Sequence, residues 1–257
     1  MSVSAEGFAR TFKYIKLFEQ GLICTVSLSA LTVIFGFVLA LLLALFRLCD
    51  PDPQHRADPL WLRFLVPDWL YRGVRRAARL LATVYVEFIR ATPLLVQLFI
   101  VYYVIFSSIS LPTFKLFGFL RFDRFLPGVV ALSLNSAAYT SEIIRAGIQS
   151  IDLGQTEASR SLGLTQGQTM RYIILPQAIK NILPAIGNEF VTIIKESSIC
   201  YTIGVQDIMY AVTATKGAAY IITEPLLVAT AVYFCLTYPT SKIIGHFERK
   251  MSRGDKR

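Results

Sequence analysis

Residues 22–46 have the sequence LICTVSLSALTVIFGFVLALLLALF and contain no charged side chain. A helix needs about 20 apolar residues to cross the hydrocarbon core of a bilayer, so this stretch alone is long enough to cross it. It is also longer than the apolar core of a cleavable signal peptide, so we expect the mature protein to retain it. The stretch therefore predicts an integral membrane protein with a helical span.

The rest of the chain repeats this pattern. The 257 residues are 54% hydrophobic and only 17% charged, with a mean hydropathy of +0.53. A transmembrane β-barrel would show short segments of alternating polarity instead. The predicted fold class is therefore an all-α membrane protein with about five transmembrane helices, near residues 20–47, 81–108, 126–147, 182–205 and 225–245.

Two of these predicted spans contain charged residues. The spans at 126–147 and 182–205 are the least apolar of the five. A charge at the centre of a membrane helix costs a few kcal/mol on insertion scales. We therefore expect these charges to face protein or a water-filled path rather than lipid.

The distribution of Lys and Arg predicts the orientation. The loops 47–79 and 145–180 and the tail from residue 242 together contain seventeen Lys and Arg residues, against seven in the segments on the opposite side. Basic residues are enriched in cytoplasmic loops of membrane proteins. We therefore expect the N-terminus outside and the C-terminus inside, with residues 249–257 as a basic cytoplasmic tail. The same distribution explains the formal net charge of +9 without nucleic-acid binding.

Two segments lie outside the predicted spans. Residues 1–19 repeat apolar side chains at helical spacing between basic ones, which predicts an amphipathic helix on the membrane surface or else a frayed polar lead-in. Residues 50–79 combine prolines, aromatic residues and arginines, which predicts a loop at the cytoplasmic membrane interface. We have no function for that loop.

The polar segment between the third and fourth predicted spans is expected to be helical. Asp152 and Thr156 are candidate N-caps, and Gly163 can end a short helix in a left-handed conformation. A second short helix can run from Gln166 to Ile174, and Pro176 marks the next break. Two short helices with a Gly bend would make a compact element that can sit in a partner's cleft. The alternative is an ordinary folded loop.

This segment resembles the EAA loop of permease subunits in ABC importers. The shared residues are spaced as in that family, with Ser159 in place of the usual second Ala: Glu157, Ala158, Ser159, Gly163, Ile173, Leu175 and Pro176. Further segments resemble the polar amino acid permeases of the histidine/glutamine/arginine type, and they lie at 87–97, 138–147, 188–190 and 195–199. Together the resemblance covers about residues 20–248.

The resemblance implies a transport subunit that is not itself an enzyme. Such a permease pairs with a second permease, identical or different, in the bacterial cytoplasmic (inner) membrane. Two cytoplasmic ATPase subunits bind ATP and Mg²⁺ and dock on the EAA loop, and an extracytoplasmic binding protein delivers the amino acid. The implied function is import of a polar amino acid by alternating access. This sequence contains no phosphate-binding P-loop motif, so the energy has to come from a partner. We expect no cofactor and no metal in this chain, since its four Cys and two His show no metal-site spacing.

Polar residues inside the predicted spans are the candidates for the substrate path. A zwitterionic amino acid needs an acceptor for its ammonium group and donors for its carboxylate. The candidates are Gln97, Asn135, Tyr139, Glu142, Glu189, Lys195, Glu196, Ser197 and Ser198. Their alternative role is hydrogen bonding between helices. Glu87 with Arg90, and Glu142 with Arg145, are spaced to pair along one helix face.

Three other functions remain as rivals. An ion-coupled secondary carrier would need internal repeats that five spans do not show. A membrane scaffold gives no reason for charges inside spans. An ABC importer for methionine or an osmolyte would use the same architecture, although the segment at 87–97 favours polar amino acids. The sequence does not identify the amino acid carried.

Overall fold

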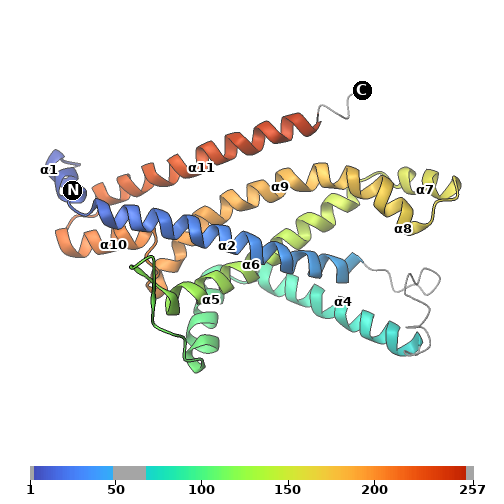
Figure 1. Cartoon of the computed structure of the whole chain (residues 1–257), viewed down its shortest axis with the longest axis horizontal. Helices are drawn as coiled ribbons and strands as arrows, with labels where there is room; N and C mark the ends of the chain where they lie inside the picture. The colour runs from blue at the N-terminus through green and yellow to red at the C-terminus, as the bar shows by residue number, and fades with distance from the viewer. Residues whose placement is uncertain (1–2, 49–67, 253–257) are drawn as a thin grey trace.

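The computed structural model describes residues 3–48 and 68–252, and it is an elongated bundle of helices (Figure 1). A short helix α1 (Ala5–Phe12) precedes the long helix α2 (Ile15–Leu48). Most of the remaining helices run alongside α2. The helical loop, residues 152–174, projects at one end of the bundle, and α1 lies at the other.

Helix α2 packs along α6 (Phe122–Gln149) through small side chains. Gly36 lies against Ser136, and Ala40 and Ala44 are buried in a cluster with Ile144. Small residues let two helix backbones approach closely, which favours association in a membrane where the hydrophobic effect does not drive it. The uncharged stretch that predicted the membrane helix is thus also the element on which α6 rests.

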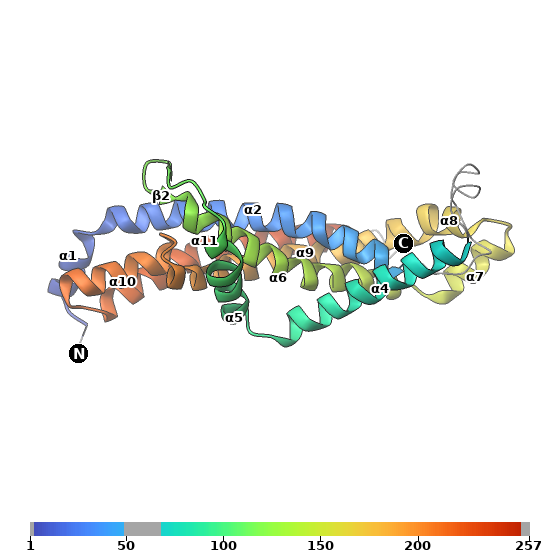
Figure 2. The same ribbon diagram turned by 90° about the horizontal axis from the view of Figure 1, so that it is seen from below.

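The predicted span at 81–108 is interrupted and strongly bent in the structure, a break that the prediction did not include. Helix α4 (Asp68–Ala91) ends before Pro93, and α5 (Leu94–Phe99) starts again after a bend of 112° (Figure 2). Proline lacks a backbone N–H and disfavours helical geometry at the residue before it, here Thr92, so the helix breaks. After α5 come a π-helical segment (Ile100–Ile105) and one 3₁₀ turn (Phe106–Ser108).

A small hairpin leads into α6. Strands β1 (Lys115–Leu116) and β2 (Leu120–Arg121) are antiparallel, with Lys115 opposite Arg121. Their turn places Phe117 and Gly118 at positive φ. Sequence patterning did not predict this hairpin.

The second half of the chain contains the helical loop, then three helices. Within the loop are α7 (Leu153–Ser161), α8 (Gln166–Thr169) and a π turn η4 (Met170–Ile174). Helix α9 (Leu175–Glu196) packs against α6 and α11 and continues as a 3₁₀ helix η5 (Ser197–Ile203). Helix α10 (Ile208–Ala219) and helix α11 (Thr223–Ser252) complete the chain. Helix α10 was not predicted.

The structure and the span prediction agree in part. Among the described residues, Ile15–Arg47 and Thr223–Met251 are long and apolar enough to cross a membrane, and the bent pair Gly73–Ala91 with Leu94–Ser108 passes the same test jointly. Helices α6 and α9, which contain the charged residues, do not pass it. The number of five spans therefore stays a prediction.

The two segments outside the predicted spans differ in what the structure says of them. Within residues 1–19, a helix does form, and Ser4 accepts a hydrogen bond from the backbone N–H of Gly7 at its start. Its buried residues Gly7 and Thr11 lie against other helices, while Phe12 remains exposed. In the loop predicted at 50–79, residues 50–67 lie outside the described residues, and the remainder forms the first turns of α4.

Gly21 offers a test of this packing. A Cβ atom added at Gly21 would lie 2.7 Å from the backbone carbonyl carbon and oxygen of Asp207, at the start of α10. We predict that Gly21→Ala destabilises the protein by about 1–3 kcal/mol, because a backbone cannot move aside as a side chain can. Gly217→Ala, where nothing lies within 4 Å, is the matched control and should be neutral or slightly stabilising. Thermal unfolding in detergent measures both, and equal unfolding temperatures would contradict the packing of α2 on α10.

Candidate functional site

The helical loop forms the predicted pair of short helices with a glycine bend. The Asp152 side chain caps α7 by accepting a hydrogen bond from the Gly154 N–H, at 2.6 Å. Thr156, the alternative cap, lies inside the helix. Gly163 has φ +85°, the left-handed conformation expected at the end of a helix. Thr165 and Gln168 then form a capping box at the start of α8.

A buried pair of hydroxyl groups holds the two short helices together. Ser159 Oγ donates to Thr169 Oγ1 at 3.0 Å, and both side chains are buried. An alanine, the usual residue of the resembling loop at this position, would lack this hydrogen bond. The serine that replaces the usual alanine at position 159 therefore has a hydrogen-bond partner, Thr169.

The outer surface of the helical loop is exposed and partly apolar. Glu157 and Ala158 are exposed on α7. Leu153 is 76% exposed and Leu162 is 85% exposed, which is unusual for leucine in a structured segment. Exposed apolar side chains gathered at one end of a molecule suit contact with another protein.

The motif residues that follow enter the next helix. Ile173 is partly buried in the π turn, and Leu175 and Pro176 stand in the first turn of α9. Pro176 therefore does not break the helix, contrary to the prediction. A proline is tolerated in the first turn because the N–H it lacks would have no partner within the helix.

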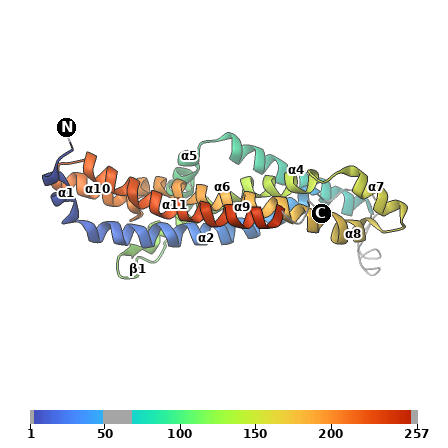
Figure 3. The same cartoon turned by 90° about the horizontal axis from the view of Figure 1, so that it is seen from above.

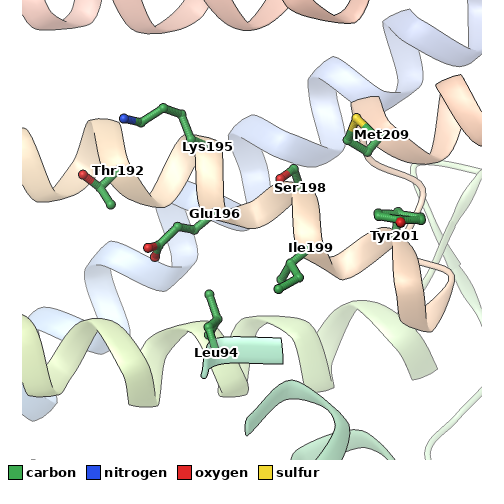
Figure 4. A pocket seen from close by; sticks show the side chains of 8 residues that line it. All are labelled: Leu94, Thr192, Lys195, Glu196, Ser198, Ile199, Tyr201 and Met209. Atoms are coloured by element: carbon green, nitrogen blue, oxygen red, sulfur yellow. The ribbon is translucent and has the colours of Figure 1, made fainter. Parts of the chain in front are cut away.

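A cavity of about 620 Å³ lies where α9 passes into η5. Figure 4 shows Glu196 pointing toward Leu94 at the start of α5, while Lys195 points to the other side of α9. The cavity lining includes three predicted residues and five others: Lys195, Glu196 and Ser198, then Leu94, Thr192, Ile199, Tyr201 and Met209. Ser197 is not among them, because it is buried and donates to the Ile194 carbonyl at 2.8 Å.

A second cavity, of about 210 Å³, brings together three more predicted residues. Tyr139, Glu142 and Glu189 line it with Arg90, Ile143 and Ala146. The guanidinium of Arg90 lies over the Tyr139 ring, 5.8 Å from its centroid. This cavity thus offers a cation, two carboxylates and an aromatic face within one space.

The ion pairs beside this cavity are only partly those predicted. Glu142 pairs with Arg145 as expected, and it also accepts a hydrogen bond from Arg47 Nη1 at 2.8 Å. Between residues 68 and 252 no ion pair joins Glu87 to Arg90. Glu142 therefore connects the end of α2 to α6, a link that sequence spacing did not indicate.

Gln97 and Asn135 lie apart from both cavities. Asn135 Nδ2 donates to Gln97 Oε1 at 2.9 Å, and both side chains are buried. Gln97 Nε2 in turn donates to the carbonyls of Ile89 and Thr92, at 2.7 and 3.0 Å. This network ties the bend between α4 and α5 to α6, the interhelical alternative that the sequence left open.

Some lining residues were missed by sequence reasoning. Thr192 is three and four residues before Lys195 and Glu196, so helical spacing was a signal for it. Tyr201 and Met209 join the cavity only because η5 turns and α10 folds back, and no local pattern of residues signals this. The described part of the chain holds no cluster of His, Cys, Asp and Glu suited to a metal ion. The thiols of Cys24, Cys200 and Cys235 are free there.

Comparison with known proteins identifies close similarities over nearly the whole chain. The family described as "Binding-protein-dependent transport system inner membrane component" matches residues 69–253. The arginine transport system permease protein ArtQ of Bacillus subtilis (strain 168) is 38% identical over 248 residues, covering 96% of this chain and 98% of that protein. A putative glutamine transport system permease protein GlnP of Rickettsia conorii is 35% identical over 240 residues, or 93% of this chain and 95% of that protein.

Solved structures match as well. A crystal structure of an amino acid ABC transporter with histidines superimposes with a TM-score of 0.78 at 39% identity, over 97% of this chain and 100% of that one. An inward-facing MetNI methionine ABC transporter gives a TM-score of 0.64 over 92% of this chain and 97% of that one. At 18% identity, the second similarity shows the fold alone.

The Gln97–Asn135 network can be tested by its energetic cost. Asn135→Ala leaves the buried Gln97 oxygen without its donor, so we predict a loss of about 1–3 kcal/mol in the free energy of unfolding. Asn188→Ala, at an exposed position of α9, is the matched control and should change stability by less than about 0.5 kcal/mol. Thermal unfolding of both variants in detergent makes the comparison. Equal effects would mean that the network holds no helices together.

Proposed function

The chain belongs to the family of binding-protein-dependent transport system inner membrane components. On that premise we propose which roles its helices, its helical loop and its two cavities have in import. It is the permease subunit of an ABC importer for amino acids, and a separate ATPase subunit hydrolyses the ATP. The observation that carries this conclusion is the match over nearly the full length of arginine and glutamine permeases. The cargo class is a polar amino acid, moved into the cytoplasm by alternating access.

The proposed topology has five membrane spans with the N-terminus outside. Helices α2 and α11 have the length and apolarity of spans, and the bent α4–α5 pair supplies another crossing. Helices α6 and α9 would be the remaining two, since they pack among these helices and Glu142 of α6 pairs with Arg47 of α2. This topology agrees with the bacterial inner membrane as location and puts the helical loop in the cytoplasm.

The helical loop is the proposed contact with the ATPase. Its exposed Glu157 and the exposed Leu153 and Leu162 supply a charged and apolar surface of the kind that protein interfaces use. The other motif residues, Ala158, Ser159, Gly163, Ile173, Leu175 and Pro176, shape the loop or join it to α9. In the proposed assembly two ATPase subunits bind ATP and Mg²⁺ and move the loops of two permeases.

The two cavities are the proposed substrate path. In the larger cavity, Glu196 can accept from the ammonium group, while the Ser198 hydroxyl can donate to the carboxylate. Lys195 also lines this cavity, but its side chain points to the other side of α9. In the smaller cavity, Glu189 and Arg90 offer a pair of opposite charges beside Tyr139 and Glu142. Each space contains complementary partners for both ends of a zwitterion, which supports their use in succession during transport.

Reconstitution tests the assignment. The chain is purified with its ATPase and binding protein, placed in liposomes, and offered arginine, histidine, glutamine, glutamate and cystine one at a time. We expect ATP-dependent uptake of at least one, together with ATPase stimulation by the loaded binding protein. If no loaded binding protein raises the rate of ATP hydrolysis, the importer assignment would be overturned.

Gly163 and Glu157 test the coupling role. Gly163→Pro cannot adopt φ +85°, so we predict that transport is lost while the protein still inserts into the membrane. Glu157→Lys should likewise abolish transport by reversing an exposed charge at the proposed interface. Both should weaken recovery of the ATPase in a pull-down with the permease.

A matched glycine serves as the control for this test. Gly167 lies in α8 with an ordinary φ and open space around it, so Gly167→Ala should transport normally. Gly163→Ala forces an alanine into the left-handed region at a cost of about 1–2 kcal/mol and should give an intermediate defect. Normal transport by Glu157→Lys and Gly163→Pro would mean that the loop is only a linker.

Glu196 tests the substrate path. Replacing its carboxylate with an amide removes a charge-assisted hydrogen bond to the ammonium group, a bond worth about 1.5–3 kcal/mol. We predict that Glu196→Gln raises the dissociation constant of the transported amino acid for the purified importer by at least about tenfold. Glu248→Gln, an exposed carboxylate on α11 outside both cavities, should leave it unchanged. Unchanged affinity in Glu196→Gln would remove this residue from the path.

A further inference from the structure

Only two non-glycine residues have positive φ in the part of the chain that the structure describes, Phe117 at 51° and Tyr220 at 56°. Both are aromatic, and both are largely exposed, at 71% and 85%. An L-residue in this region costs about 1–2 kcal/mol relative to a right-handed conformation. Strained residues that persist at exposed positions are candidates for function, because folding alone would favour glycine there.

Tyr220 occupies the position where a helix end favours glycine. It is the C-cap of α10, and its backbone N–H donates to the Lys216 carbonyl at 3.0 Å. Glycine would make the same bond without strain. Beside the ring is a cavity of about 220 Å³ lined by Lys216, Tyr220, Ile221 and Ile222. The turn between α10 and α11 thus presents an aromatic side chain, a lysine and a shallow apolar recess together.

This turn lies at the edge of the apolar part of the bundle, just before the candidate span Thr223–Met251. The start of α10 packs on Gly21, at the end of the uncharged stretch that begins with Leu22. From there α10 extends through twelve residues, about 18 Å at 1.5 Å per residue, and its far end lies beside α1. Figures 1 and 3 show this end of the molecule opposite the helical loop. Tyr220 therefore lies at the end of a proposed membrane span, where its exposed ring can meet a soluble partner.

The charges near this end are predominantly basic. Lys13, Lys16, Lys115 and Lys216 are exposed, and none has an ion pair among the described residues. The nearby acids are mostly engaged or buried, because Glu6 pairs with Arg10, Asp123 pairs with Arg121, and Asp207 and Glu224 are buried. Glu19 is the exposed exception. The surface is therefore complementary to an acidic partner.

We propose that Tyr220 and Lys216 form the docking point of this chain for the extracytoplasmic solute-binding protein, through an acidic surface of that protein. The ring would fill a recess on the partner, as buried aromatic anchors do in protein interfaces, and Lys216 would pair with its carboxylates. Phe117 lies in the turn of the β1–β2 hairpin, which is in the same half of the molecule as α10, and it would be a second contact (Figure 2). This inference rests on the proposed importer function, which supplies the partner.

The test uses the complete importer in liposomes and titrates the loaded binding protein against ATPase activity. Tyr220→Gly removes the ring and relieves the backbone strain, so misfolding is not expected. We predict that it raises the half-maximal concentration of binding protein at least about tenfold, with basal ATPase activity unchanged. Tyr220→Phe keeps the ring and should stay within about twofold of wild type. Lys216→Glu should raise the half-maximal concentration and reduce its dependence on salt.

A photoreactive phenylalanine at position 220 identifies the contact directly. Crosslinking to the binding protein supports the proposal, whereas crosslinking to lipid alone overturns it in favour of a membrane anchor. An unchanged half-maximal concentration in Tyr220→Gly would also overturn it. If wild-type importer shows no stimulation by any loaded binding protein, the proposed function fails first, so the two failures are distinguishable.

Discussion

The proposed coupling between ATPase and substrate path depends on one mechanical constraint. This constraint is the continuous helical backbone that runs from Gln166 through the π turn to Glu196. At 1.5 Å per residue this helix spans about 45 Å. One end is bonded to α7 through the Ser159 and Thr169 hydroxyls, and the other end carries Glu196 to the larger cavity. A push on the helical loop can therefore reach the cavity through continuous helical backbone, in which the π turn and Pro184 are the two irregular points.

The charged helix α6 is stabilised within the bundle by ion pairs with its charged side chains, and not by an apolar surface alone. Glu142 on α6 accepts hydrogen bonds from Arg47 of α2 and from Arg145 of its own helix, so its charge is compensated between helices. Leaving such a carboxylate unpaired in an apolar environment costs several kcal/mol. The bend at Pro93 frees carbonyl groups in the same way, and the Gln97 amide satisfies those of Ile89 and Thr92. Polar side chains thus allow an irregular path through a largely apolar bundle.

Much of the fold and of the helical loop could be predicted from local features of the sequence. The uncharged stretch at 22–46 predicted α2, and Gly163 predicted the left-handed bend, because each depends on its own residue types. The break at Pro93 also had a local signal, but overall hydropathy concealed it. The Arg47–Glu142 pair, the helix α10, and the parts of the cavity from Tyr201 and Met209 depend on contacts between distant segments, which periodicity in one sequence does not encode.

The claim that the helix from Gln166 to Glu196 moves as one body can be measured directly. Spin labels at the exposed residues Gln166 and Asn188 lie on either side of the π turn. Their distance distribution would be recorded by pulsed electron resonance in the reconstituted importer, without nucleotide and with ATP trapped, in samples that show binding-protein-stimulated ATPase activity. If the helix moves as one body, the distance distribution will be narrow and the same in both states. A shift or a broadening on ATP binding would place a hinge at the π turn and contradict it.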